Sequence, residues 1–167
     1  MTQSWDRIYT PHRLEYLRAA VTSEECPFCA APELNGSDTL DLVAHRGQLA
    51  YVVLNLYPYN AGHLLICPYR HVADYTELTN AERDEISRLT QESMHTLRAI
   101  SGAQGFNLGM NQGSISGAGI AAHLHQHGVA RWGGDANFMP IIGETKVLPQ
   151  LLTQTRDQLQ EGWISSH

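Results

Sequence analysis

The sequence is short of lysine and of long apolar stretches. Lys146 is the single lysine among 11 basic residues, and the formal net charge is −6. Because binding to the backbone of nucleic acids requires a concentrated positive surface, nucleic acid is not expected as a partner. No apolar run approaches the roughly 20 residues that cross a bilayer, and the first residues lack the basic-then-apolar pattern of a signal peptide. The sequence therefore predicts a cytoplasmic protein with no membrane partner.

Cysteine is also scarce, with three residues in the chain, too few for a disulfide framework. Cys26 and Cys29 form a CxxC motif, and in a cytoplasmic protein this spacing indicates metal binding or redox chemistry. Cys67 lies in an apolar stretch and is interpreted as an inert core residue.

The length of 167 residues predicts one domain. A short helix is expected over 11–20 in an N-terminal extension (1–25), followed by a core over about 26–137. Apolar and β-branched runs predict strands at 40–45, 50–54, 63–67, 106–110 and 120–129. Thr79 and Glu82 have the spacing of a capping box before a long helix that Gly102 ends, and a last helix is predicted within 146–163. This order favours an α+β fold with one antiparallel sheet of about five strands.

The most informative motif is a row of histidines at alternate positions, His123, His125 and His127, just after a glycine-rich run. On a strand, residues two apart point to the same face, so three imidazoles would line up beside a loop with accessible backbone N–H groups. Taken alone, the row has three interpretations: a structural cluster, a zinc site, or a nucleophilic histidine with two histidine helpers.

Several linked motifs accompany this row. They are VLNLYP at 53–58, GHLLICP at 62–68, RHV at 70–72 and the loop that ends in GAG at 117–119. Over about 26–137 the chain resembles the histidine triad (HIT) superfamily of nucleotide hydrolases and transferases. Within that superfamily, residues 50–68, 131–138 and 148–152 are most similar to the actinobacterial diadenosine tetraphosphate phosphorylase branch.

The resemblance implies roles for His125, His127 and His63, with His123 in a supporting role. His125 matches the nucleophile, which would attack an α-phosphorus and form a nucleotidyl-histidine that water or phosphate then releases. His127 would lend a proton to the leaving group. His63 matches a fourth histidine that would hold the far nitrogen of the nucleophile in the right tautomer, although a core histidine is the alternative.

The resemblance also implies a nucleotide site. Backbone N–H groups of Gly117, Ala118 and Gly119 would stabilise charge on the phosphoryl oxygens. Asn55 would meet the ribose, Asn111 the phosphate or ribose, and Leu56 with Phe28 would wall the base; each of these side chains has a turn or core role as its alternative. Trp132 would stack on a second base, or else cover the sheet edge or a subunit contact.

In relatives with the N-terminal CxxC, zinc is bound at the position of His71 and by the first histidine of the row, here His123. Two thiolates and two imidazoles would make a closed structural Zn²⁺ site, with no position for a reacting water. No cofactor is expected for the chemistry itself.

The sequence thus predicts an enzyme that cleaves phosphoric anhydride bonds of dinucleoside polyphosphates, as a phosphorylase that uses phosphate or as a hydrolase. Two alternatives stay open: an adenosine 5′-phosphoramidate hydrolase, and a nucleotide- or zinc-binding interaction module without turnover. A zinc hydrolase is a further chemical rival. The family commonly forms a homodimer, and the phosphorylase branch can assemble into a tetramer.

Overall fold

The computed structural model describes residues 26–34, 41–135 and 149–166. Its five strands are β1 (Val43–Arg46), β2 (Ala50–Leu54), β3 (Leu64–Pro68), β4 (Gly105–Met110) and β5 (Gln126–Arg131). They form one sheet in the order β1-β2-β3-β5-β4, and every neighbouring pair is antiparallel. The helices are α2 (Pro27–Ala30), α3 (Asn80–Ser101) and α5 (Leu152–Glu161), with 3₁₀ turns at Ala31–Glu33 and Tyr75–Glu77. The predicted α+β fold with a five-stranded antiparallel sheet is confirmed.

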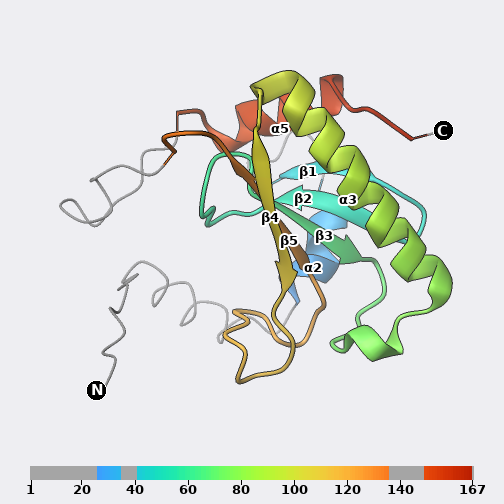
Figure 1. Cartoon of the computed structure of the whole chain (residues 1–167). Helices are drawn as coiled ribbons and strands as arrows, with labels where there is room; N and C mark the ends of the chain where they lie inside the picture. Colours follow the sequence, from blue (N-terminus) through green and yellow to red (C-terminus); the bar gives the residue numbers. More distant parts are fainter. Residues whose placement is uncertain (1–25, 35–40, 136–148, 167) are drawn as a thin grey trace, which may run out of the picture.

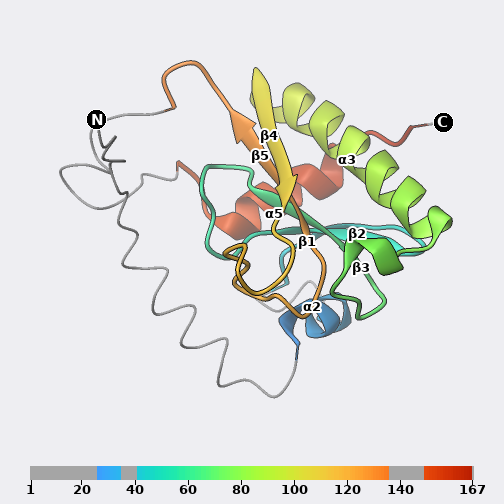
Figure 2. The same cartoon turned by 60° about the horizontal axis from the view of Figure 1, so that its bottom comes forward.

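The two faces of the sheet carry different elements. Helix α3 crosses one face, whereas α2 and the loop between β4 and β5 lie on the other side (Figures 1 and 2). Gln126 points to α3, since its Nε2 donates to Thr90 Oγ1 over 2.7 Å. Strand alternation therefore puts His127 on the opposite face, in register with Leu65 and Gly109 on the neighbouring strands.

Two predicted elements begin later in the structure than expected. The strand predicted at 120–129 is wrong in its first half, because β5 begins at Gln126 and the Leu124 N–H bonds to Val72 O, outside the sheet. The last helix begins at Leu152, because Leu151 is extended and its N–H bonds to the Gln154 side chain. The helix predicted over 11–20 lies outside the described residues.

Helix α3 begins and ends as predicted. The Thr79 hydroxyl accepts from the Glu82 N–H, the Glu82 carboxylate accepts from the Thr79 N–H, and Gly102 closes the helix in the left-handed region at φ 65°. None of the helices in the described segments combines the length and the apolarity that crossing a membrane requires.

Glu82 makes this helix start sensitive to acid. Hydrogen bonds from Arg70, which outweigh the effect of burial, and then bonds from Thr79 lower the pKa of Glu82 from 4.5 to about 2. A carboxylate with a depressed folded-state pKa stabilises the protein above its unfolded value, so this contribution should disappear as the pH falls from about 4.5 through about 2. Glu82→Gln should lower the free energy of unfolding by about 1–2 kcal/mol at pH 7 and should weaken the loss of stability between about pH 4.5 and 2. Urea unfolding at several pH values measures both effects. A variant that loses stability with acid as steeply as the unaltered protein would contradict this assignment.

Candidate active site

The three histidines of the row separate instead of lining one strand face. Only His127 belongs to β5; His123 lies at a bend before it, and His125 lies in the irregular chain between. The His125 ring is buried, and its Nδ1 lies 2.8 Å from His123 O. A carbonyl can only accept, so Nδ1 carries the proton and Nε2 keeps its lone pair. Burial lowers the pKa of His125, which favours this neutral form. The geometry leaves His125 Nε2 unprotonated, as a nucleophile at this position would require.

His63 and His127 form a second, linked pair. The Tyr59 N–H donates to His63 Nδ1 over 3.0 Å, so neutral His63 carries its proton on Nε2. That Nε2 lies 2.9 Å from His127 Nδ1 and donates to it. Neutral His127 must then hold its own proton on Nε2, where it can donate a hydrogen bond.

This pairing differs from the role expected for His63. The expectation placed His63 on the far nitrogen of the nucleophile, but that nitrogen bonds to the His123 carbonyl, and His63 bonds to His127. The His127 and His125 ring centres are 5.1 Å apart, so the two side chains still form one site. The Tyr59 ring stacks within 15° of parallel on His127 and shields this pair.

A cluster of four side chains lies directly beside the nucleophile. Cys26, Cys29, His71 and His123 each offer one ligand atom, and all four atoms lie within 4.8 Å of one another. Three Sγ–Nδ1 separations in the cluster run from 3.3 Å for Cys29 and His71 to 3.6 Å for Cys29 and His123. With zinc bonds of about 2.3 Å to sulfur and about 2.0 Å to nitrogen, tetrahedral geometry requires about 3.5 Å. The cluster could therefore hold a metal ion such as zinc.

The tautomer of His123 also suits a metal ligand. Its Nε2 donates to Pro68 O over 2.9 Å, which leaves Nδ1 unprotonated and directed at the two cysteines. Cys67 stands apart from the cluster and is fully buried, and burial raises the pKa of its thiol. That environment agrees with the interpretation of Cys67 as an unreactive core residue.

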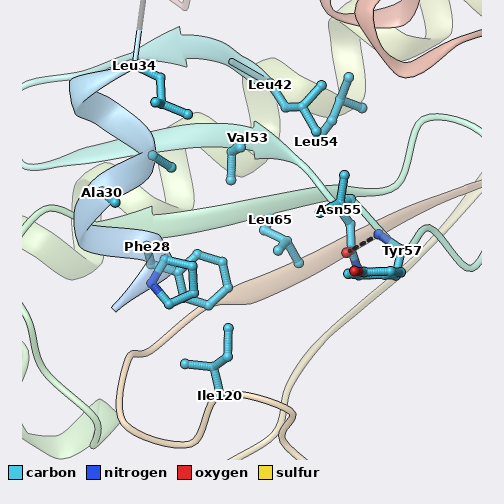
Figure 3. A pocket seen from close by; sticks show the side chains of 13 residues that line it. Phe28, Ala30, Leu34, Leu42, Val53, Leu54, Asn55, Tyr57, Leu65 and Ile120 are labelled. Atoms are coloured by element: carbon cyan, nitrogen blue, oxygen red, sulfur yellow. Dashed lines mark hydrogen bonds between the residues drawn. The ribbon is translucent and has the colours of Figure 1, made fainter. Parts of the chain in front are cut away.

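An apolar cavity of about 260 Å³ adjoins the histidines. Figure 3 shows Phe28 and Ala30 of α2 on one side, Val53 and Leu65 on the strands behind, and Ile120 facing Phe28 from the β4–β5 loop. The cavity is lined by Pro27, Phe28, Ala30, Ala31, Leu34, Leu42, Val53, Leu54, Asn55, Leu56, Tyr57, Leu65 and Ile120. Its size and apolar walls suit a planar base, with a few polar groups at one end.

The predicted nucleotide residues fall into two groups. Phe28, Asn55 and Leu56 all line the cavity, and the Phe28 ring centre lies 4.8 Å from that of His125. Asn111 directly follows β4, and 117–119 lead into the cavity residue Ile120. Gly117 has φ +84°, a conformation that suits glycine.

Trp132 is not brought together with the histidines. Trp132 is six positions after Gln126, so strand alternation directs both side chains to the face of the sheet that carries α3. The Trp132 Nε1 donates to Ser101 O over 2.9 Å. Its ring lines a separate cavity with Leu97 and Ile100 of α3. This placement matches the alternative interpretation of Trp132 as a residue that covers the sheet.

Comparison with known proteins agrees with this site. The sequence model of the HIT domain matches residues 41–133. The chain belongs to the HIT family. The resemblance drawn from the histidine row and its accompanying motifs is thereby confirmed. An AP-4-A phosphorylase of Mycobacterium tuberculosis is 46% identical to this HIT protein over 165 residues, which cover 94% of this chain and 84% of the relative.

Solved structures share the fold. A zinc-bound histidine triad family protein from Mycobacterium smegmatis aligns with a TM-score of 0.65 at 21% identity, covering 83% of this chain and 92% of the other. The diadenosine triphosphate hydrolase of Plasmodium falciparum aligns with a TM-score of 0.59 at 17% identity, covering 72% and 74% of the two chains.

The sequence did not identify Tyr51 as a residue of the site. Tyr51 stands in the apolar strand β2 and is fully buried, yet its hydroxyl donates to Phe28 O over 2.6 Å. The only hint in the sequence was that a buried tyrosine hydroxyl needs a partner, which does not say where the partner lies.

Proposed function

We propose that this HIT protein cleaves dinucleoside polyphosphates through a nucleotidyl-histidine on His125. The observation that carries the proposal is the fixed tautomer of His125, whose unprotonated Nε2 belongs to a buried neutral ring next to the cavity. The 46% identity to an AP-4-A phosphorylase supports diadenosine tetraphosphate as the substrate class.

The reaction has two steps. In the first, His125 Nε2 attacks the α-phosphorus, a nitrogen–phosphorus bond forms and the bond to the bridging oxygen breaks. The His127 Nε2–H donates a hydrogen bond to that oxygen and stabilises the negative charge with which the nucleotide leaves. In the second step phosphate or water attacks the adduct and restores His125. With diadenosine tetraphosphate, phosphorolysis yields ADP and ATP, whereas hydrolysis yields AMP and ATP.

The bound nucleotide would use both polar and apolar groups of the site. The base would enter the cavity against Phe28 and Leu56, and Asn55 would meet the ribose. Asn111 and the backbone of 117–119 would face the phosphates, where fixed N–H groups stabilise developing charge. Trp132, on the other side of the sheet, has no part in this arrangement.

We also propose that Cys26, Cys29, His71 and His123 bind one structural Zn²⁺. Four protein ligands fill a tetrahedral zinc, so no position is left for a reacting water. The ion would fasten α2 to the chain just before β5 and leave the chemistry to the histidines. A zinc hydrolase is disfavoured by this closed ligand set.

The proposed reaction is tested by its products. Purified protein is incubated with diadenosine tetraphosphate with and without phosphate, and the nucleotides are resolved by chromatography. ADP with ATP, formed only with phosphate, supports the phosphorylase, and AMP with ATP in both samples supports the hydrolase. Rapid loss of an adenosine phosphoramidate without turnover of the dinucleotide would replace the proposal by the alternative enzyme. No turnover of either would favour a binding module.

We further propose a homodimer that uses the free edge of β4. This strand ends the sheet, and Leu108 on it is 48% exposed. Exposed edge strands readily pair with a second chain. Leu108→Asp should convert the dimer to a monomer in light scattering after size exclusion, while Leu49→Asp, at another exposed leucine, should leave the mass unchanged. A dimer that survives Leu108→Asp would contradict the use of this edge.

A further inference from the structure

Helix α2 belongs to the metal cluster and to the nucleotide cavity at once. Cys26 and Cys29, two of the four cluster residues, flank Phe28 in the sequence. Pro27, Phe28 and Ala30 line the cavity (Figure 3). The helix has four residues, a single turn that cannot be stable by itself, so its position depends on what holds it.

A hydrogen bond from β2 also holds this turn. Tyr51 is fully buried on β2, and its hydroxyl donates to Phe28 O over 2.6 Å. Burial raises the pKa of Tyr51, so the hydroxyl remains a donor at all relevant pH values. The cysteine ligands fix the two ends of the turn, and Tyr51 fixes the carbonyl between them.

These interactions fix the position of the Phe28 ring. It is 8% exposed, and its centre lies 4.8 Å from the His125 ring and 5.6 Å from the His123 ring. A shift of the turn would therefore change the wall of the cavity and the packing of the nucleophile together. Because the metal ligand His123 is two residues from His125, the same displacement would reach the nucleophile along the chain as well.

We propose that Tyr51 and the Cys26–Cys29 cluster are positioning groups for the nucleotide cavity, and that binding of the metal and of the nucleotide are consequently coupled. This inference rests on the proposed function, since it assumes zinc at the cluster and a nucleotide in the cavity. Coupling between two ligands is reciprocal. The factor by which zinc strengthens nucleotide binding is the factor by which the nucleotide strengthens zinc binding.

The first test measures both directions of the coupling. AMP is titrated calorimetrically into zinc-loaded protein and into protein stripped of zinc, and zinc affinity is measured against a chromophoric chelator with and without saturating AMP. We expect AMP to bind about 10-fold more weakly without zinc, and zinc to bind tighter with AMP by the same factor. The chelator assay begins from the loaded protein and remains informative if the stripped protein unfolds. Zinc affinity that is independent of AMP would overturn the coupling.

Failure of the proposed function is recognised separately. If the protein binds zinc but no AMP, or AMP but no zinc, the assignment of the site that stays empty is wrong and the coupling is overturned with it. If both bind and neither affects the other, the proposed function stands and only the coupling is overturned.

The second test uses Tyr51→Phe, which removes the hydroxyl and keeps the ring. We expect one zinc per chain to be retained, zinc release to the chelator to become faster, and KM for the dinucleotide to rise about 3-fold or more with kcat little changed. Tyr75→Phe, at an exposed tyrosine away from the cavity, is the matched control and should change neither quantity. A Tyr51→Phe protein that only loses stability, with KM and zinc release unchanged, would show a purely structural role and overturn the assignment of Tyr51.

Discussion

His125→Ala is expected to lower the rate of dinucleotide cleavage by at least about 10³-fold, because the variant has no group that can form the covalent adduct. Nucleotide binding should survive, since the cavity walls on β2 and β3 do not include His125. Steady-state kinetics with diadenosine tetraphosphate measures the first quantity, and AMP calorimetry measures the second.

A matched histidine variant separates this effect from the general effect of replacing a histidine by alanine. His95 is an exposed histidine on α3, outside the site, so His95→Ala should retain full activity. His127→Asn should have an intermediate effect, about 10²-fold, since it removes the imidazole N–H that is aimed at the leaving oxygen and keeps His125. Activity of His125→Ala within 10-fold of the unaltered protein would contradict the assignment of the nucleophile.

Cys29→Ser is the second change with a large expected effect. It removes a ligand that lies close to both His71 and His123, so bound zinc should fall from one per chain to none. Because structural zinc contributes its binding free energy to folding, we expect the free energy of unfolding to drop by roughly 2–5 kcal/mol. Elemental analysis and urea unfolding measure the two quantities.

Cys67→Ala provides the control for this prediction. Cys67 is buried and does not belong to the cluster, so the variant should keep its zinc even if the small cavity left by the side chain costs some stability. A Cys29→Ser protein that retains one zinc per chain would contradict the proposed ligand set. Equal zinc loss in the two variants would do the same.

Much of the fold could be predicted because its signals are local. The capping box at Thr79 and Glu82, and Gly102 at the end of α3, are short-range patterns whose hydrogen bonds the structure reproduces. The strand order could not be obtained in this way, since β5 inserts between β3 and β4 through contacts distant in the sequence.

The histidine row shows the limit of a periodicity argument. Alternate spacing predicted one row of imidazoles on a single strand face, but β5 starts at Gln126, after the first two histidines. Before that point the chain bonds to Pro68 O, at the end of β3, and to Val72 O, just after β3. Periodicity cannot identify these partners. The three rings consequently meet three different neighbours: the cysteines, a backbone carbonyl and His63.

The hydrogen bonds that set the proton positions were even less accessible from sequence. The role of His63 depends on a backbone N–H from Tyr59 and on the distance to His127, and neither follows from residue type. Tyr51 shows the same limit, because its partner is a carbonyl 23 positions away.

Direct detection of the covalent adduct is the closest test of nucleophilic catalysis by His125. Protein is mixed briefly with diadenosine tetraphosphate in the absence of phosphate, quenched without acid, digested and examined by mass spectrometry. We expect an acid-labile adenylyl group on the peptide that carries His125, formed no more slowly than turnover and absent from His125→Ala. Turnover at full rate with no adduct, or an adduct on a different residue, would contradict it.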